Sequence, residues 1–326
     1  MALAAGAFAA WHYASLGLTL SHYDAKGHLV VARRILDGIN PGWVQIGAVW
    51  LPLPHLLNML PAQVDAWYRT GLAAVALSVL SFAATAAILT RLVTWATGSF
   101  LAAAIGIAVF IASPDVLYLQ ATPMTEPLLM LLVAASVWLV IRAVEAPGPG
   151  RTRAAGLAVA AAFLTRYEAW PACGALLGFA LLANWRRGAP FVDALRRAWR
   201  IALYPAWAVA AFLVLGRAST GAWFTTSGFF VPENIASGRP VKAVLSVWWG
   251  AHELTSYVLA TLALTGFVVT SWTAVRYRSR SLLICLLALL AAAALPAYAF
   301  YSGHPFRIRY MVPIVPAVAV GLGLFV

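Results

Sequence analysis

Residues 70–90 read TGLAAVALSVLSFAATAAILT, an apolar stretch without a charged side chain. An α-helix needs about 20 such residues to cross the hydrocarbon core of a bilayer. Comparable apolar stretches lie on both sides of it, at 2–20, 99–113, 125–142, 154–167, 169–185, 200–216, 255–275, 281–300 and 310–326. The sequence therefore predicts an all-α, polytopic transmembrane bundle of about ten spans, forming one domain over residues 1–326.

The composition excludes a water-soluble globular protein. Hydrophobic residues make up 63% of the 326 residues and charged residues only 10%, against about 25% charged in an ordinary soluble domain. Cys173 and Cys285 lie far apart in apolar stretches, so neither a disulfide framework nor a zinc cluster is expected. The first stretch lacks a basic flank, which favours a retained span over a cleaved signal peptide. The last stretch stops at Val326 without a polar exit, so we expect more chain beyond it.

The net charge of +12 reports topology in a membrane protein, and no nucleic-acid partner is expected. Ten arginines fall within about 40 positions of one set of alternate loops, nearly three times the basic density of the other set. The basic set is 91–98, 143–153, 186–199 and 276–280, and the other set is 21–69, 114–124, 217–254 and 301–309. Because basic loops face the cytoplasm, we expect the N-terminus inside and the long loops 21–69 and 217–254 outside.

The acidic residues gather on the expected outer side. Burying a charge at a span end is costly and usually marks function, so any chemistry is expected at the outer face. Eight of the ten acidic residues lie in the outer loops or at outer span ends: Asp24, Asp37, Asp65, Asp115, Glu126, Glu168, Glu233 and Glu253.

The first outer loop is expected to lie along the membrane interface. From residue 25 to 36, apolar residues alternate with Lys26, His28, Arg33 and Arg34, which is typical of an interfacial helix with a basic face toward lipid headgroups. The stretch 50–60 contains two prolines and is too short to span.

Asp24 follows the first span and has two interpretations. It is either the N-cap of the interfacial helix, a common role for aspartate, or a catalytic carboxylate. His22 and His28 flank it, and the His-x-Asp spacing could bind a metal ion, although interfacial histidines usually have no such role.

Three further segments carry polar groups at outer span ends. In TPMTEP (122–127), Glu126 is either part of an ordinary helix N-terminus or a group facing a cavity shared with Asp24 and Asp115. In LTRYEAWP (164–171), Arg166 and Glu168 either form a structural ion pair or Arg166 faces the same cavity. The stretch YSGHPFRIRYMVP (301–313) places Arg307 and Arg309 close to His304.

Two arginines at an outer span end do not serve the positive-inside rule. Arginine has a fixed fork of donors that suits phosphate oxygens, so Arg307 and Arg309 are expected to bind either a specific phosphate or lipid headgroups. The aromatic residues of loop 217–254 form either a cavity lid or an interfacial belt. They are Trp223, Phe224, Phe229, Phe230, Trp248 and Trp249.

This ordered set resembles the GT-C superfamily of membrane glycosyltransferases, in particular its bacterial ArnT- and protein-mannosyltransferase-like group. The resemblance covers most of the chain. It rests on Asp24 opening a long first loop, on YDAKGHLVVARRILDG (23–38) and VWLPLPHLL (49–57), and on TPMTEP, LTRYEAWP and RIRYMVPIVPA (307–317).

The resemblance implies an inverting glycosyltransferase that moves a sugar from a polyprenyl-phosphate carrier to a hydroxyl of a glycan, lipid or protein. It implies glycan biosynthesis in the cell envelope, at the outer face of a bacterial cytoplasmic (inner) membrane. Asp24 would be the general base, and Arg307, Arg309 and Arg166 would hold the donor phosphate.

Further candidates for the cavity are Lys26, His28, His55, Asp115, Glu126, Glu168 and His304. Some members of the superfamily use a divalent metal, Mg²⁺ or Mn²⁺, and here Asp24, Asp115 and Glu126 would be its ligands.

Two other classes of function remain open. A transporter or lipid flippase would show repeats and midplane charges, and a non-catalytic scaffold would need no acid and arginine pair at the outer face.

Overall fold

The computed structural model describes residues 1–47, 49–223 and 233–326, which fold into helices without any strand in that part of the chain. The α-helices are α1 (Ala2–Ser15), α2 (Tyr23–Arg34), α3 (Leu53–Asn58), α4 (Asp65–Thr70), α5 (Leu72–Thr97), α6 (Phe100–Ala112), α7 (Pro114–Gln120), α8 (Glu126–Glu145), α9 (Pro149–Phe163), α10 (Ala169–Arg186), α11 (Phe191–Thr220), α12 (Pro240–Thr255), α13 (Tyr257–Arg276), α14 (Ala294–Tyr301) and α15 (Val315–Phe325). The 3-10 segments are η1 (Trp43–Gln45), η2 (Pro61–Gln63), η3 (Arg278–Ala293) and η4 (Ile308–Ile314).

Each of the ten apolar stretches forms a helix, but the count of about ten spans is not confirmed. In the described residues, six helices are long and apolar enough to cross a membrane, or up to seven if the α6–α7 pair, bent by 63°, is one span. The helices α1 and α9 have only 14 and 15 residues, which is shorter than a spanning helix needs. The six long apolar helices make the chain an integral membrane protein.

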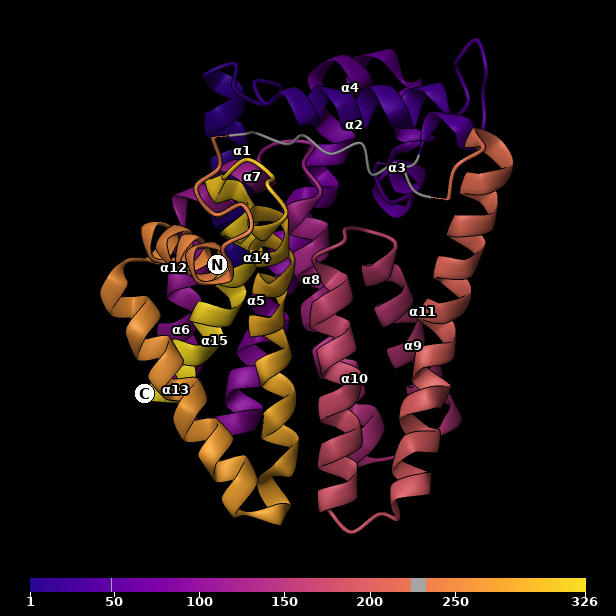
Figure 1. Ribbon diagram of the computed structural model, residues 1–326. Coiled ribbons are helices and arrows are strands. Elements are labelled where there is room, and N and C mark those ends of the chain that lie inside the picture. The colour runs from indigo at the N-terminus through magenta and orange to yellow at the C-terminus, as the bar shows by residue number, and fades with distance from the viewer. Residues whose placement is uncertain (48, 224–232) are drawn as a thin grey trace.

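The helices of the first loop lie across one end of the bundle, as predicted. Figure 1 shows α2, α3 and α4 at the top of the view, over the ends of the long helices. The helix α2 turns Ala25, Leu29 and Ala32 inward and exposes Lys26. His28 was predicted on the polar, headgroup-facing side and is instead 8% exposed. This prediction was wrong because an imidazole can be buried against another hydrogen-bonding side chain, which the one-dimensional pattern does not reveal.

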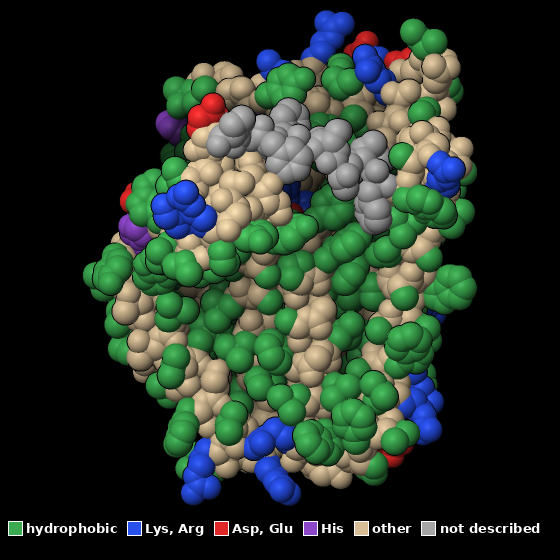
Figure 2. Space-filling view, viewed as in Figure 1, with side chains coloured by type: hydrophobic (Ala, Val, Ile, Leu, Met, Phe, Trp, Pro, Cys, Tyr) green, Lys and Arg blue, Asp and Glu red, His purple; other side chains and the backbone are tan. Residues whose placement is uncertain are grey.

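The two loop sets identified in the sequence lie at opposite ends of the bundle. The turns from α10 to α11 and from α13 to η3 are at the bottom of Figure 1, far from α2–α4. Lys and Arg side chains are visible at that end in Figure 2. The arrangement fits the alternation on which the topology prediction was based.

The second long loop, 217–254, contains a helix in its described part. Residues 240–255 form α12, which runs across the bundle in Figure 1 rather than along it. Trp248 and Trp249 both lie on this helix, and the Trp249 ring is 5.4 Å from the ring of Phe306. Trp223 is exposed, while Phe224, Phe229 and Phe230 lie outside the described residues.

The helix α15 lies at the centre of the packing and makes its closest contacts through glycine. A Cβ atom on Gly266 of α13 would collide with the carbonyl oxygen of Gly321, and one on Gly106 of α6 would collide with that of Ala319. Small residues allow helix backbones to approach closely in membranes. This packing fixes the position of η4, the segment directly before α15 that carries Arg309.

Candidate active site

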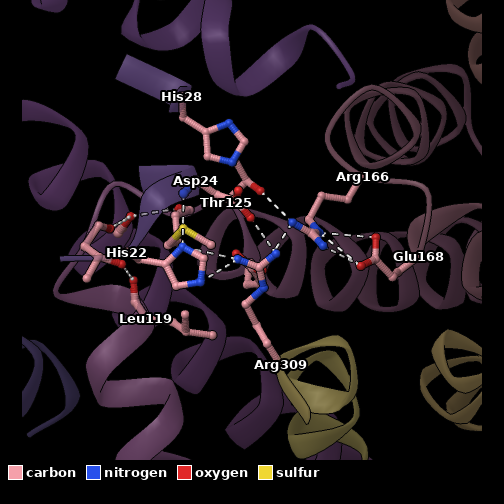
Figure 3. A network of polar contacts seen from close by, with 12 residues as sticks. His22, Asp24, His28, Leu119, Thr125, Arg166, Glu168 and Arg309 are labelled. Carbon is pink, nitrogen blue, oxygen red and sulfur yellow. Dashed lines mark hydrogen bonds and ion pairs between the residues drawn. The ribbon is translucent and has the colours of Figure 1, made fainter. Parts of the chain in front are cut away.

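Five charged side chains of alternating sign contact one another, and Figure 3 labels four of them, Asp24, Arg309, Arg166 and Glu168. The order along the chain of contacts is Asp24, Arg309, Glu126, Arg166 and Glu168. Arg309 Nη2 is 2.7 Å from Asp24 Oδ2, and Arg309 Nε is 3.5 Å from Glu126 Oε1. Arg166 Nη1 is 3.2 Å from the same Glu126 oxygen, and Arg166 Nη2 is 2.6 Å from Glu168 Oε1. Segments far apart in the sequence thus build one charged centre.

Glu126 is the most deeply buried member of the centre. It begins α8, as predicted, with Pro127 in the first turn, where the positive end of the helix dipole favours a carboxylate. Its side chain is fully buried, and neither carboxylate oxygen makes a hydrogen bond with the residues that the structure describes. An isolated buried carboxylate is costly, so Arg166 and Arg309 are the groups that compensate it.

Arg166 forms the ion pair that was one of its two interpretations. It forms the ion pair with Glu168 and also reaches Glu126. Burial lowers the pKa of its guanidinium, but the charges of Glu126 and Glu168 outweigh burial and raise that pKa overall. Thr125 directly precedes α8. Its hydroxyl makes no capping bond and instead accepts a hydrogen bond of 3.0 Å from Arg166 Nη1.

His22 caps the helix α2, and Asp24 does not. The Nδ1 atom of His22 accepts from the Asp24 backbone N–H at 3.1 Å, while Nε2 lies 2.9 Å from Arg309 Nη1. A neutral imidazole has one bare nitrogen, so only one of the two contacts is a hydrogen bond at a time. Burial and the charge of Arg309 lower the pKa of His22. The sequence named this residue as a flank of Asp24 and as part of a His-x-Asp spacing that could bind a metal ion, and no motif signalled its contact with Arg309.

A pair of histidines lies against the charged centre. His28 Nδ1 is 3.0 Å from His55 Nε2, and His55 Nδ1 is 3.1 Å from the carbonyl oxygen of Leu51. Burial lowers the pKa of His55 to about 4. Burial and the neighbouring His55 also hold the pKa of His28 well below its usual value.

Four predicted site residues take no part in the ion pairs of the charged centre. Lys26 is exposed on α2, and Arg307 is exposed directly before η4. Asp115 lies in the first turn of α7, and no ion pair involves it among the described residues. The ring of His304 packs 5.4 Å from that of Tyr310. Arg307 and Arg309 were predicted to act as a pair, but only Arg309 joins the centre.

The sequence matches no protein-family model and no curated protein. One solved structure resembles the fold over 92% of this chain: ArnT from Cupriavidus metallidurans in the apo state, with a TM-score of 0.59 and 16% sequence identity. The chain has a GT-C-like fold. It covers 54% of the ArnT chain, about half its length, and at this identity the likeness establishes the fold alone. The predicted GT-C-like fold is therefore confirmed, although the predicted count of about ten spans is not.

A divalent metal was expected, if at all, on Asp24, Asp115 and Glu126. Mg²⁺ and Mn²⁺ need oxygen ligands that converge on one point, whereas Asp24 and Glu126 each face an arginine. Among the described residues, no three His, Cys, Asp or Glu side chains are grouped so as to hold a metal ion. Asp24 and Glu126 are therefore better placed to pair with arginines than to bind a metal ion.

Proposed function

We propose that this protein is an inverting glycosyltransferase. It moves a sugar from a polyprenyl-phosphate carrier to a hydroxyl of a glycan, lipid or protein acceptor. The observation that carries the proposal is the carboxylate of Asp24, held by Arg309 at the capped end of a GT-C-like bundle. An acid and a guanidinium side by side supply what the reaction needs: a proton acceptor and a partner for phosphate.

Asp24 acts as the general base in this proposal. It takes the proton of the acceptor hydroxyl while that oxygen attacks the anomeric carbon of the donor. The bond between the anomeric carbon and the phosphate oxygen breaks, and polyprenyl phosphate leaves with the electron pair. One direct displacement inverts the anomeric configuration.

Arg309 can bind the departing phosphate only by exchanging partners. Its donors are directed at Asp24, His22 and Glu126. Arg307 is exposed and forms no ion pair with the described residues, so its donors are available to a ligand. We therefore assign the first phosphate contact to Arg307. Phosphate then replaces Asp24 on Arg309, which stabilises the developing charge and frees the carboxylate to accept a proton.

The site faces outward in this proposal, across the cytoplasmic membrane of a bacterium. Support comes from the basic loops at the end of the bundle opposite α2–α4 (Figures 1 and 2), since loops rich in arginine stay in the cytoplasm.

The Asp24→Asn variant tests the proposal. We expect transfer from polyprenyl-phosphate sugars to fall by about 10²- to 10⁴-fold, the usual contribution of a general base. Binding of undecaprenyl phosphate, measured by native mass spectrometry, should persist because asparagine keeps the size of the side chain. Asp115→Asn is the matched control and should leave transfer unchanged. Full transfer by the Asp24 variant would remove this residue as the base.

The assignment of Arg307 has its own test. Because a hydrogen bond to a charged group is worth about 1.5–3 kcal/mol, Arg307→Ala should weaken undecaprenyl-phosphate binding roughly 10- to 100-fold. Arg217→Ala, on the exposed end of α11, serves as the control for a general loss of positive charge. Equal affinity in both variants would contradict a specific role for Arg307.

A further inference from the structure

The hydrogen bonds of His55 and His28 determine which ring nitrogens carry hydrogen. A carbonyl oxygen can only accept, so the contact between Leu51 O and His55 Nδ1 requires a hydrogen on that nitrogen. Both rings are neutral near pH 7, because burial lowers the pKa of each. His55 Nε2 is therefore bare and accepts from His28 Nδ1. The neutral ring of His28 carries its one hydrogen on Nδ1, so its Nε2 is bare as well.

The ring of His28 faces the charged centre. In Figure 3 it extends from α2 toward Thr125 and Arg166. The charges of Arg166 and Arg309 act on it, since both contribute to its lowered pKa. A small cavity of about 20 Å³ lies beside the charged centre, and its polar lining residues are His28, Thr125, Asn58 and Ser78. That space admits one water molecule or one functional group of similar size.

Two acceptors on this side of the centre receive no hydrogen bond from the described residues, although Glu126 is ion-paired with Arg166 and Arg309. His28 Nε2 makes no hydrogen bond within the described residues, and neither oxygen of the buried Glu126 makes one. A phosphate offers only acceptors at neutral pH and would not satisfy a bare ring nitrogen. A hydroxyl group donates, fits the space and carries no charge into a centre that already holds five charged side chains.

We propose that His28 Nε2 accepts a hydrogen bond from a hydroxyl of the sugar in the polyprenyl-phosphate donor, with His55 holding the ring in the required tautomer. The inference rests on the proposed function and adds a residue that recognises the carbohydrate. The sugar is bonded directly to the phosphate, so its hydroxyls lie within one ring of the group that Arg309 binds. His28 is then a substrate-binding residue and His55 a positioning residue.

Two substitutions of His28 separate this role from a structural one. An asparagine amide can take the place of Nδ1 and keep the bond to His55, but it offers nothing at Nε2. A glutamine can place its oxygen near Nε2 and loses the bond to His55. Recognition of a sugar hydroxyl predicts that His28→Asn is impaired and His28→Gln is tolerated. A purely structural role predicts the reverse order.

The probes are farnesyl phosphate and its glucosyl, mannosyl, galactosyl and arabinosyl esters, bound to the full chain in detergent. We expect the wild-type protein to bind at least one ester more tightly than bare farnesyl phosphate. His28→Asn should lose about tenfold in affinity for that ester, the effect of one hydrogen bond, and His28→Gln should stay within about threefold. Both variants should bind the bare phosphate like the wild-type protein.

Each other outcome contradicts a definite statement. If the wild-type protein binds the bare phosphate as tightly as every ester, the sugar contact is wrong while phosphate recognition stands. If even the bare phosphate does not bind, the proposed function fails and the inference falls with it.

Independently of any ligand, ¹⁵N NMR of histidine-labelled protein should find both His28 and His55 protonated on Nδ1 alone, with the His28→Asn spectrum providing the assignment. A proton on Nε2 of His28 overturns the inference.

Discussion

The carboxylate of Glu126 links the two halves of the charged centre, because Arg166 and Arg309 both contact its Oε1 atom. Removing one partner of a buried ion pair leaves the other charge without compensation. Such changes typically destabilise a protein by about 3–5 kcal/mol. At the residue scale, the Glu126 side chain therefore contributes to the stability of the folded protein as well as to the charge of the candidate active site.

We expect Glu126→Ala to lower the free energy of unfolding by about 3 kcal/mol, since each arginine keeps one other carboxylate. Thermal unfolding of the purified protein in detergent measures the change. Asp193→Asn is the control: this acid near the start of α11 is ion-paired with Arg196, but its side chain is 46% exposed, so the change should shift the midpoint little. A Glu126 variant as stable as this control would show that the two guanidiniums do not depend on the buried acid.

The histidine pair predicts a pH dependence of stability. The pKa of His55 falls to about 4 in the folded protein from an ordinary value of 6.5, so between these values the unfolded chain binds the additional proton. Stability is therefore complete above about pH 6.5 and is lost progressively toward pH 4, by up to about 3 kcal/mol from this residue. Unfolding midpoints measured across this range should flatten in His55→Gln. An equally steep profile in that variant would assign the dependence to other groups.

Sequence alone could identify some of these residues and not their partners. Asp24, Glu126 and Arg309 stand out because polar side chains at the ends of apolar stretches are few. The choice between Arg307 and Arg309 could not be made, because Arg307 has an extended backbone directly before η4 and the register of that junction decides which side chain points inward. The contact of His22 with Arg309 joins positions 287 residues apart, and no local pattern encodes it.

At the scale of elements, glycine positions decide how closely α13, α6 and α15 approach. We expect Gly266→Ala to destabilise the protein by about 1–3 kcal/mol, the usual cost of overpacking, because its Cβ would meet the backbone of α15. Gly178→Ala on α10 is the matched control, since no atom lies within 4 Å of the added Cβ. That change should be neutral or slightly stabilising through helix propensity. Unfolding midpoints of the two variants in the same detergent provide the comparison, and equal midpoints would contradict the close packing.

The pattern of apolar stretches predicted where helices form better than how they lie. Every predicted stretch is helical, because local hydrophobicity determines helix formation in a membrane. The short α1 and α9 were counted as spans since composition does not fix helix ends. The helix α12 lies in the segment 217–254, which was predicted to connect two spans and which carries Arg239, Lys242 and Glu253. An amphipathic helix lying across a bundle has this composition, and only its packing against Phe306 and Met311 distinguishes it from a loop.

At the scale of the whole molecule, the two ends of the bundle should face different compartments. We expect a membrane-impermeant thiol reagent to label Ile39→Cys in intact cells and to label Arg187→Cys only after lysis, because loops rich in arginine stay in the cytoplasm. Both positions are exposed, and the two native cysteines are buried. Labelling of Arg187→Cys in intact cells, without labelling of Ile39→Cys, would reverse the proposed orientation.

The ion pair between Asp24 and Arg309 joins residues 285 positions apart, and this separation has a consequence for biosynthesis. At the usual rate of translation the ribosome needs roughly 15 to 60 seconds to advance from one residue to the other. Once Glu168 has been synthesised and until Arg309 follows, Asp24, Glu126, Arg166 and Glu168 hold three acids against one cation. The centre reaches its final balance only when η4 and α15 join the bundle. A nascent chain interrupted earlier therefore carries an excess of negative charge near the membrane, a feature by which cellular quality control could recognise it before it meets substrate.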